Sequence, residues 1–403
     1  GVIGALPMLI SEAVPVGFTD AVFESVSGLT TTGATVLSGL DDLPRSMLFY
    51  RQQLQWLGGM GVIVLAVAIL PMLGIGGMQL YKAEIPGPMK ESKLTPRIAE
   101  TAKALWYVYL AITIACALAY WLAGMTVFDA ICHSFSTVST GGFSTHDASM
   151  AYWNSTPIDI IATVFMLIGG ISFALHFAVW RGKSLLAYMR DPECRFFLGL
   201  MLLYMLMVGG GLLVFGVHEA PGEATRHAAF QVASFGTGTG LTSTNAAAWP
   251  GFIPLLLVFT SFIGGCAGST AAGMKVVRAA LVFRHSIREL RRLIYPNGVF
   301  ALRFGKHVVN DRVLQAVWGF VGVYITLSVI FTLLFTTTGM DLTTAVSAVA
   351  ASINNLGVGI GQVGGGFANI TDEAKWMMTL LMLLGRLEIF TFLVLFTPLF
   401  WRQ

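Results

Sequence analysis

Long and short apolar stretches alternate along this chain, a pattern that predicts membrane-spanning helices separated by re-entrant segments. Long stretches approaching the roughly 20 residues needed to cross a bilayer lie near 48–73, 104–124, 157–180, 196–217, 250–282, 314–338 and 374–400. Shorter apolar stretches lie at 20–29, 129–138, 225–235 and 342–353. Because these are too short to cross, we expect each to enter the membrane as a half-helix.

Each short stretch leads into a loop rich in glycine and hydroxyl residues, and the four loops align without a gap on one glycine. The aligned glycines are Gly33, Gly142, Gly240 and Gly357, which lie 109, 98 and 117 residues apart. Hydroxyl side chains recur two residues later at Thr35, Ser144 and Thr242, with Gly359 as the exception. This shared frame disfavours the alternative of four unrelated polar loops.

Span, half-helix, loop and span, repeated four times, indicate an all-α polytopic membrane protein. Rings of backbone carbonyls from four such loops can replace the hydration shell of an ion, so we interpret the chain as a cation pore. We expect its span–pore-loop–span repeats at 1–80, 98–181, 194–292 and 309–403. They would lie parallel around a central pore, in a pseudo-fourfold arrangement like that of potassium channels.

The number of crossings supports parallel repeats. Each repeat crosses the membrane an even number of times, whereas inverted-repeat transporters need an odd number. The chain opens within residues 1–10, which resemble the last turns of an outer helix. We therefore expect the first repeat to be incomplete at its N-terminus.

Composition agrees with a membrane protein. The chain is 55% hydrophobic and 11% charged, with a mean hydropathy of +0.74, whereas soluble domains are about 25% charged. Its cysteines show no CxxC motif and no metal-ligand spacing, so we expect them to be packing residues. They are Cys116, Cys132, Cys194 and Cys266.

Charge is distributed unevenly between the two sides. Basic residues gather in alternate loops: Lys82, Lys90, Lys93, Arg97 and Lys103; Arg181, Lys183, Arg190 and Arg195; Arg278, Arg284, Arg288, Arg291, Arg292, Arg303, Lys306 and Arg312. The positive-inside rule makes these loops and the C-terminus cytoplasmic. The pore-loop side collects acids, including Asp20, Asp41, Asp129, Asp147 and Asp341. An acidic mouth would concentrate cations; solvated acids left by ordinary positive-inside depletion are the alternative.

The half-helices carry polar residues at aligned positions. Asp20, Asp129 and Asp341 open three of them, where a carboxylate caps free N–H groups and complements the helix dipole. Glu24, His133 and Gln231 share one aligned column, with Ala348 in the fourth half-helix. These side chains either brace the loops from behind or bond locally to neighbouring backbone.

The stretch 250–282 is interrupted by the segment 264–273, which has four glycines and no large side chain. A continuous helix is disfavoured because each glycine costs about 1 kcal/mol relative to alanine. Irregular backbone at membrane depth is tolerated where it is buried or lines a cavity, so we expect a gate loop below the filter. Close helix packing through Gly264 and Gly268, a GxxxG pair, is the alternative.

Arg386 lies near the middle of the last apolar stretch. A charge there costs about 2.5–3.5 kcal/mol and usually faces a cavity or a partner. We expect Arg386 to face the conduction path and to contact the gate loop. A structural tie to backbone carbonyls, or to Glu388 of a neighbouring helix, is the alternative.

Three features together resemble the Trk/Ktr/HKT superfamily of potassium transporters: the glycine frame, the sequence GGCAGSTAAGMK at 264–275 and LLGRLEIFT at 383–391. The segments at 75–84, 141–147 and 399–402 are similar to the bacterial TrkH-type branch. The resemblance covers essentially the whole chain. It departs from the family in the fourth loop, which lacks hydroxyls, and in lacking two additional N-terminal helices.

The resemblance implies channel-like uptake of K⁺ and Rb⁺ in preference to Na⁺ and Li⁺. Filter carbonyls would come from Thr30, Thr31, Thr32 and Gly33; Ser139, Thr140, Gly141 and Gly142; Thr237, Gly238, Thr239 and Gly240; and Asn354, Asn355, Leu356 and Gly357. Gate residues would be Gly264, Gly265, Gly268, Ser269, Thr270, Gly273 and Lys275, with Arg386.

The resemblance also implies a homodimer in the bacterial inner membrane, with pore loops facing the periplasm. A cytosolic TrkA-type ring protein would be its partner and would bind NAD(H) or ATP/ADP. This chain has no GxGxxG or P-loop motif, so we expect no cofactor on it beyond K⁺ as substrate. We expect the chain to lie in a lipid bilayer and to bind no nucleic acid. The basic loops would bind the ring protein, and binding of anionic lipid is the alternative explanation for them.

Two other functions stay open. A symporter coupled to H⁺ or Na⁺ would need ionisable groups along the path, for which Glu24, His133 and His176 are candidates. An intramembrane enzyme could use Ser172 and His176, four residues apart, as nucleophile and base. No third orienting group accompanies that pair in the sequence, so we expect a transporter and not an enzyme.

Overall fold

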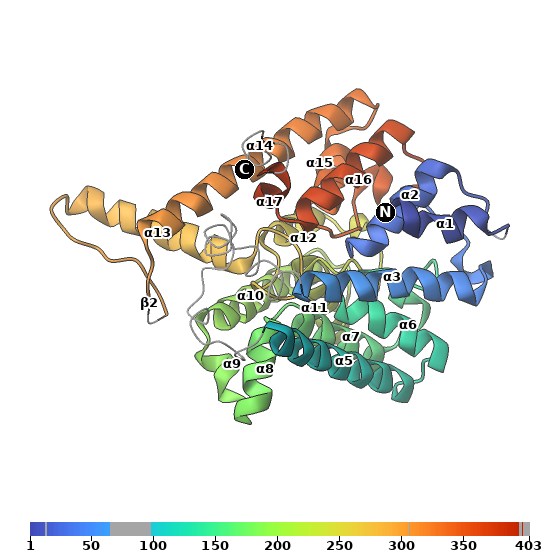
Figure 1. Ribbon diagram of the computed structural model, residues 1–403, viewed down its shortest axis with the longest axis horizontal. Coiled ribbons are helices and arrows are strands. Elements are labelled where there is room, and N and C mark those ends of the chain that lie inside the picture. The colour runs from blue at the N-terminus through green and yellow to red at the C-terminus, as the bar shows by residue number, and fades with distance from the viewer. Residues whose placement is uncertain (13, 65–97, 306, 395–396, 398–403) are drawn as a thin grey trace.

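A computed structural model describes the chain except for residues 13, 65–97, 306, 395–396 and 398–403. The described part is helical apart from one short hairpin (Figure 1). Its helices are α1 Val2–Ile10, α2 Phe18–Leu29, α3 Arg45–Val64, α5 Ile98–Leu122, α6 Val127–Val138, α7 Thr156–Gly169, α8 Phe173–Gly182, α9 Leu186–Arg190, α10 Pro192–Val214, α11 Pro221–Thr237, α12 Ile253–Ile263, α13 Val276–Ile294, α14 Asp311–Thr337, α15 Leu342–Ile353, α16 Asp372–Arg386 and α17 Ile389–Val394. Strands β1 Arg303–Phe304 and β2 His307–Val308 pair antiparallel. The 3₁₀ turns of the described residues lie at Leu40–Asp42, Ser149–Tyr152, Ala246–Ala248 and Gly361–Val363.

All four predicted half-helices are present, as α2, α6, α11 and α15. Their caps differ in part from the prediction. Asp341 caps α15 by accepting from Thr344 N. Asp129 does not cap α6, because Thr126 occupies the N-cap position and its hydroxyl accepts from Asp129 N. Asp20 lies in the first turn of α2 and pairs with Lys375 Nζ at 2.6 Å.

The half-helices pack in a closed cycle with the helices that follow them. Each half-helix contacts one helix from the preceding unit: α6 contacts α3, α11 contacts α7, α15 contacts α12, and α2 contacts α16. The last contact joins the two ends of the described chain. Elements about 350 residues apart in sequence therefore become neighbours, as the blue and red helices beside one another in Figure 1 illustrate.

Within the described residues, three helices are long and apolar enough to cross a membrane, at 102–122, 192–214 and 311–337. The expected span 157–180 is not one straight helix. It is divided into α7 and α8, which meet at an angle of 96°. Carbonyl groups that lose their helical partners at the bend accept hydrogen bonds from residues distant in sequence. Gly170 O, for example, accepts from Cys266 N at 2.8 Å.

The expected span 374–400 is also broken. α16 ends at Arg386, Glu388 has a positive φ of 61°, and α17 begins at Ile389. The predicted interruption of 250–282 is confirmed, because α12 ends at Ile263 and α13 begins only at Val276. The second half of the expected span 48–73, the motifs at 75–84 and 399–402, and the basic residues between 82 and 97 lie outside the described residues.

Candidate functional site

The four aligned glycines meet in a closed ring. A Cβ atom added to any of them would lie 2.0–2.1 Å from the carbonyl oxygen of the residue preceding the next glycine. The pairs are Gly33 with Gly141 O, Gly142 with Thr239 O, Gly240 with Leu356 O, and Gly357 with Thr32 O. Only glycine leaves room for this approach, so the shared frame of the sequence reflects a shared position in space.

The backbone of each loop alternates in handedness. The four glycines have φ between 71° and 87°, and the residues two places earlier, Thr31, Thr140, Gly238 and Asn355, have φ between 47° and 69°. The intervening residues lie outside the positive-φ region. This alternation turns successive peptide carbonyls toward the same side of the chain, as a carbonyl-lined ion path requires.

The side chains of these loops bond among themselves. Thr30 and Thr32 share a hydroxyl–hydroxyl bond of 2.7 Å, and Thr237 and Thr239 share another of 2.7 Å. In the fourth loop, Asn355 Nδ2 donates to Thr32 Oγ1 at 2.9 Å. The missing hydroxyls of the fourth loop are therefore replaced by an amide that ties it to the first loop.

The aligned polar column braces the backbone that follows each glycine. Glu24 Oε2 accepts from Val36 N at 3.0 Å, and His133 Nε2 bonds Ser144 Oγ at 3.0 Å. Gln231 Nε2 donates to Thr244 O at 3.0 Å. In the fourth unit, where the column holds alanine, the adjacent Ser347 Oγ accepts from Ile360 N at 2.7 Å. These bonds support the bracing interpretation, while His133 Nδ1 also bonds Asp129 O in its own helix at 2.9 Å, as the alternative expected.

A buried ion pair behind the first loop was missed in the sequence. Arg51 of α3 pairs with Glu24 at 2.6 Å, and both side chains are 0% exposed. Arg51 also donates to Thr35 Oγ1 at 3.0 Å and lies 4.2 Å from the Phe143 ring centroid. An arginine inside an apolar stretch is the feature that could have revealed it, since intramembrane charges mark functional sites.

Gln55, one turn further along α3, holds the second loop on both sides of Gly142. Its Nε2 donates to Gly141 O at 2.6 Å, and its Oε1 accepts from Phe143 N at 3.1 Å. A single amide therefore satisfies two buried backbone groups of the ring. Nothing in the local sequence distinguishes Gln55 from Gln52, which is equally buried.

Gln55→Leu should destabilise the protein and distort the ring. The substitution leaves two buried backbone groups without a hydrogen-bond partner, and each such loss costs about 1–3 kcal/mol of stability. We expect a fall in Tm and reduced discrimination between K⁺ and Na⁺ in flux assays. The control is Gln52→Leu, because the Gln52 amide is fully buried and makes no hydrogen bond within the described part of the chain. Equal losses in both variants would contradict a specific role for Gln55.

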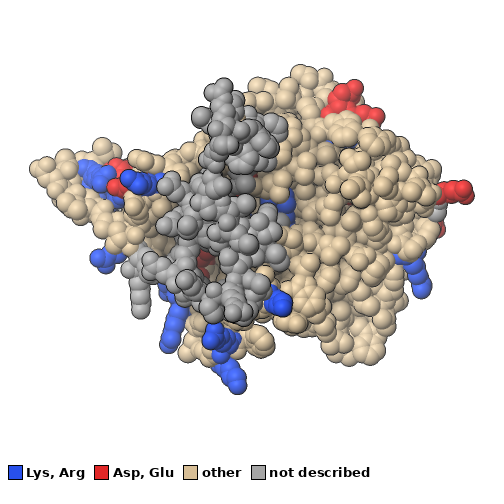
Figure 2. Space-filling view, viewed as in Figure 1, with Lys and Arg blue, Asp and Glu red and all other residues tan. Residues whose placement is uncertain are grey.

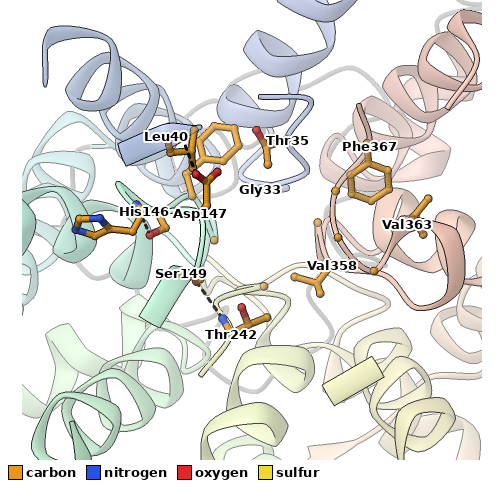
Figure 3. Close-up of a pocket in the computed structure, with 18 of the residues that line it drawn as sticks. Gly33, Thr35, Leu40, His146, Asp147, Ser149, Thr242, Val358, Val363 and Phe367 are labelled. Atoms are coloured by element: carbon orange, nitrogen blue, oxygen red, sulfur yellow. Dashed lines mark hydrogen bonds between the residues drawn. The ribbon is translucent and has the colours of Figure 1, made fainter. Parts of the chain in front are cut away.

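A cavity of about 180 Å³ opens above the ring. Gly33, Gly142, Gly240 and Gly357 all line it, and Figure 3 shows the loops of all four units converging on it. Asp147 and His146 also belong to its lining. The acidic-mouth interpretation is supported for Asp147 only in part, because Asp147 Oδ2 already accepts from Leu40 N at 2.9 Å. Asp20, remote from the cavity lining, is paired with Lys375.

His146 Nδ1 bonds the Asp41 carboxylate at the rim of this cavity. This hydrogen bond holds the pKa of Asp41 below its usual range. A depressed pKa contributes stability above the pKa of the unfolded chain, and that contribution is lost as pH falls through the folded value.

Asp41→Asn should therefore lower Tm slightly near neutral pH, with the difference from the parent protein shrinking as pH falls below about 4. Because Asp41 is largely exposed, solvent screening keeps the effect small. Thermal unfolding across a pH series measures it. A difference that persisted undiminished in acid would contradict the assignment.

The segment 264–275 lies directly against the ring. Thr270 Oγ1 donates to Val138 O at 2.9 Å, at the end of α6 where the second loop begins. A Cβ on Gly238 of the third loop would lie 3.7 Å from Ala272 Cβ. Further bonds run from Cys266 N to Gly170 O and from Phe173 N to Gly268 O, at 2.8 and 3.0 Å. Lys275 Nζ folds back onto Ala271 O.

Arg386 contacts this segment. Its Nη1 donates to Thr270 O at 2.8 Å, while the buried Nε and Nη2 have no hydrogen-bond partner among the described residues. Glu388 does not pair with Arg386; it pairs with Arg278 of α13 at 2.9 Å. The break between α16 and α17 thus carries two charged residues that hold the segment 264–275 and the helix that follows it. The bond to Thr270 O is both the expected contact with this segment and the tie to a backbone carbonyl that was the alternative, whereas the alternative partner Glu388 is excluded. That Arg386 faces the conduction path stays a prediction.

Ser172 and His176 do not form a nucleophile–base pair. His176 Nδ1 bonds Tyr188 Oη at 2.7 Å and Nε2 bonds Ile168 O at 2.9 Å. Both ring nitrogens are thereby occupied away from Ser172.

Residues 1–402 match a family model described as TrkH, a cation transport protein. The chain belongs to the TrkH family. This membership confirms the prediction of a transporter instead of an enzyme.

Curated members of the family are similar over the whole chain. The Trk system potassium uptake protein TrkH of Vibrio parahaemolyticus serotype O3:K6 is 55% identical over 405 residues, covering 100% of this chain and 84% of the relative. The corresponding protein of Escherichia coli K12 is 52% identical over 403 residues, covering 100% and 83%. The crystal structure of the potassium transporter TrkH from Vibrio parahaemolyticus has a TM-score of 0.91 and 53% identity, covering 100% and 83%. This chain is thus an all-helical, multi-pass membrane transporter.

Proposed function

We propose that this TrkH-family transporter takes up potassium by selective, channel-like permeation of K⁺ and Rb⁺ through the ring of four glycine loops. The closed ring of glycine–carbonyl contacts carries this proposal. Four inward-turned carbonyl sets around one axis offer the oxygen cage that a dehydrated monovalent cation needs. The printed names of the relatives, which describe potassium uptake, agree with it.

The units 1–80, 98–181, 194–292 and 309–403 are the proposed repeats of this pore. The cyclic packing of each half-helix on the preceding unit supports four parallel repeats with pseudo-fourfold order. The filter ligands are the carbonyls at 30–33, 139–142, 237–240 and 354–357.

The segment 264–275 is the proposed gate. It is hydrogen-bonded to the base of the second loop and lies against the third, so it stands where an ion would leave the ring. Arg386 contributes a buried positive charge and a bond to Thr270 O beside that exit. Both features oppose cation passage while the segment is in this position.

The regulatory and cellular setting is proposed from the family resemblance and the charge pattern. Lys and Arg side chains dominate the lower left of the molecule in Figure 2, whereas acids appear at its upper right. The basic side would face the cytoplasm of a bacterial inner membrane and receive a TrkA-type ring carrying NAD(H) or ATP/ADP. The transporter would act as a homodimer.

A symporter coupled to H⁺ or Na⁺ is the second candidate, and one observation weighs against it. The expected coupling groups are each engaged in structural bonds: Glu24 with Arg51, His133 with Asp129 O and Ser144, and His176 with Tyr188. Releasing Glu24 or His133 would remove a brace of a glycine loop, and releasing His176 would break its bonds to Tyr188 and Ile168 O.

Cation flux in proteoliposomes that contain this chain alone tests the proposal. K⁺ and Rb⁺ should move down an imposed gradient much faster than Na⁺ and Li⁺, without proton movement. Flux that required a proton or sodium gradient would replace the channel-like mechanism with symport.

A further inference from the structure

A large apolar cavity lies on the flank of the molecule, outside the ion path. Its volume is about 880 Å³, within the ~300–1,000 Å³ typical of ligand sites. Its walls come from α5, the bend between α7 and α8, α9 and the start of α10. The lining includes Ala111, Ile168, Ile171, Trp180 and Leu198.

The cavity lies at membrane depth. Two of its walls, α5 and α10, are among the helices long and apolar enough to cross a bilayer. Among its polar groups, His176 and Tyr188 bond to each other, while Tyr107 and Trp180 each bring one polar atom on a largely exposed side chain, so the lining offers little to water. Apolar cavities stay dry and favour apolar guests, and unfilled ones forfeit dispersion contacts.

The rim of the cavity has the features of a membrane surface. Trp180 and Met189, which line it, are largely exposed, and so are the neighbouring apolar residues Leu185 and Leu186. Lys183 and Arg190, also exposed, alternate with them between α8 and α10. Figure 2 shows basic side chains projecting at the foot of the molecule, where Figure 1 places α8 and α9. Aromatic and basic residues gather at lipid headgroups.

We propose that this cavity binds an acyl chain of an anionic phospholipid, whose headgroup is held by Lys183 and Arg190. The apolar walls select the chain, and the two cations select a negative headgroup over a zwitterionic one. The cavity also borders the bend between α7 and α8, which is hydrogen-bonded to the proposed gate segment. Ile168 and Ile171 flank this bend, and its Gly169 and Gly170 carbonyls accept from Thr270 and Cys266. A bound acyl chain would stabilise the bend.

Native mass spectrometry of the detergent-solubilised protein tests the site without relying on transport. Palmitoyl-oleoyl phosphatidylglycerol is titrated and compared with palmitoyl-oleoyl phosphatidylcholine. We expect a saturable phosphatidylglycerol adduct on the parent protein. Filling the cavity with Ala111→Trp or, from the opposite wall, Leu198→Trp should weaken this adduct at least about tenfold. Combining Lys183→Gln with Arg190→Gln should weaken it about tenfold, toward the phosphatidylcholine level.

The matched control is Leu206→Trp, which places the same bulky side chain on an exposed position of α10 outside the cavity; its adduct should equal that of the parent. The exposed charge variants test the proposal even if a filling variant fails to fold. Phosphatidylglycerol adducts that survive cavity filling, or that show no preference over phosphatidylcholine, would overturn the proposal. A change in oligomer mass with lipid adducts unaltered would assign the cavity to a second copy of the chain instead. Because the readout is lipid binding, its failure leaves the proposed potassium flux untouched.

Discussion

Gly142→Ala should lower K⁺ flux by at least about a hundredfold, equivalent to roughly 3 kcal/mol in the barrier. The new Cβ would lie 2.1 Å from Thr239 O of the next loop, far inside van der Waals contact. Neither residue can move apart from the other without a large cost in free energy, because the backbone of both is buried in a closed ring. Relief therefore displaces the carbonyls that would hold the ion, and Na⁺ should be excluded less well in the residual flux.

The control for this variant is Gly216→Ala. Gly216 also has a positive φ, 66°, but nothing lies within 4 Å of its added Cβ. Both variants introduce the strain of an L-residue at positive φ, about 1–2 kcal/mol. Only in Gly142→Ala does the new Cβ also collide with a carbonyl oxygen. Proteoliposome flux with K⁺ and Na⁺ compares them. Similar flux in the two variants would show that backbone strain, and not the ring contact, governs conduction.

Arg386→Ala should raise K⁺ flux about tenfold or more without preventing folding. Hydrogen bonds from charged groups contribute about 1.5–3 kcal/mol, and about 1.4 kcal/mol corresponds to a factor of ten. Loss of the bond to Thr270 O frees the segment 264–275 to leave its position under the ring. Removal of a buried positive charge beside the proposed ion exit should also lower the electrostatic barrier to cations.

Arg284→Ala is the matched control for Arg386→Ala. Arg284 Nη1 likewise donates to a backbone carbonyl, Arg303 O, at 2.7 Å, but on an exposed face in the middle of α13. Its loss should leave flux unchanged. Arg386→Lys keeps the charge and should lie between the parent and Arg386→Ala. Unaltered or reduced flux in a well-folded Arg386→Ala protein would remove Arg386 from the gating mechanism.

Local patterns predicted the half-helices well. The structure places α15 at Leu342–Ile353, as expected from the sequence, and the other three within a few residues. Each is a short apolar run that stops within two residues of a backbone position with positive φ, namely Thr31, Thr140, Gly238 and Asn355. Its limits therefore follow from local composition and backbone sterics. The same reasoning located the break between α12 and α13, because glycine-rich backbone disfavours helix wherever it lies.

The bends of the other long stretches escaped prediction for a physical reason. Residues 157–180 and 374–400 are mostly apolar but contain glycine at 169–170 and 385 and charges at Arg386 and Glu388. Their overall hydropathy alone does not distinguish a straight helix from a broken one. Their breaks are stabilised by partners distant in sequence, such as Gly268 O for Phe173 N and Arg278 for Glu388. Gln55 was missed on the same grounds, since its bonds reach residues more than 80 positions away.

The sequence by itself determined that this is a helical membrane transporter with four glycine loops in a common frame, because span length, charge asymmetry and glycine sterics are local properties. Only the tertiary structure decided how the four loops contact one another in a ring, which amides and charges brace them, and which groups hold the segment 264–275, whose place below the filter was expected from the sequence. Those features depend on contacts between residues far apart in the chain, whose backbone groups find partners only once the units have assembled around a common axis.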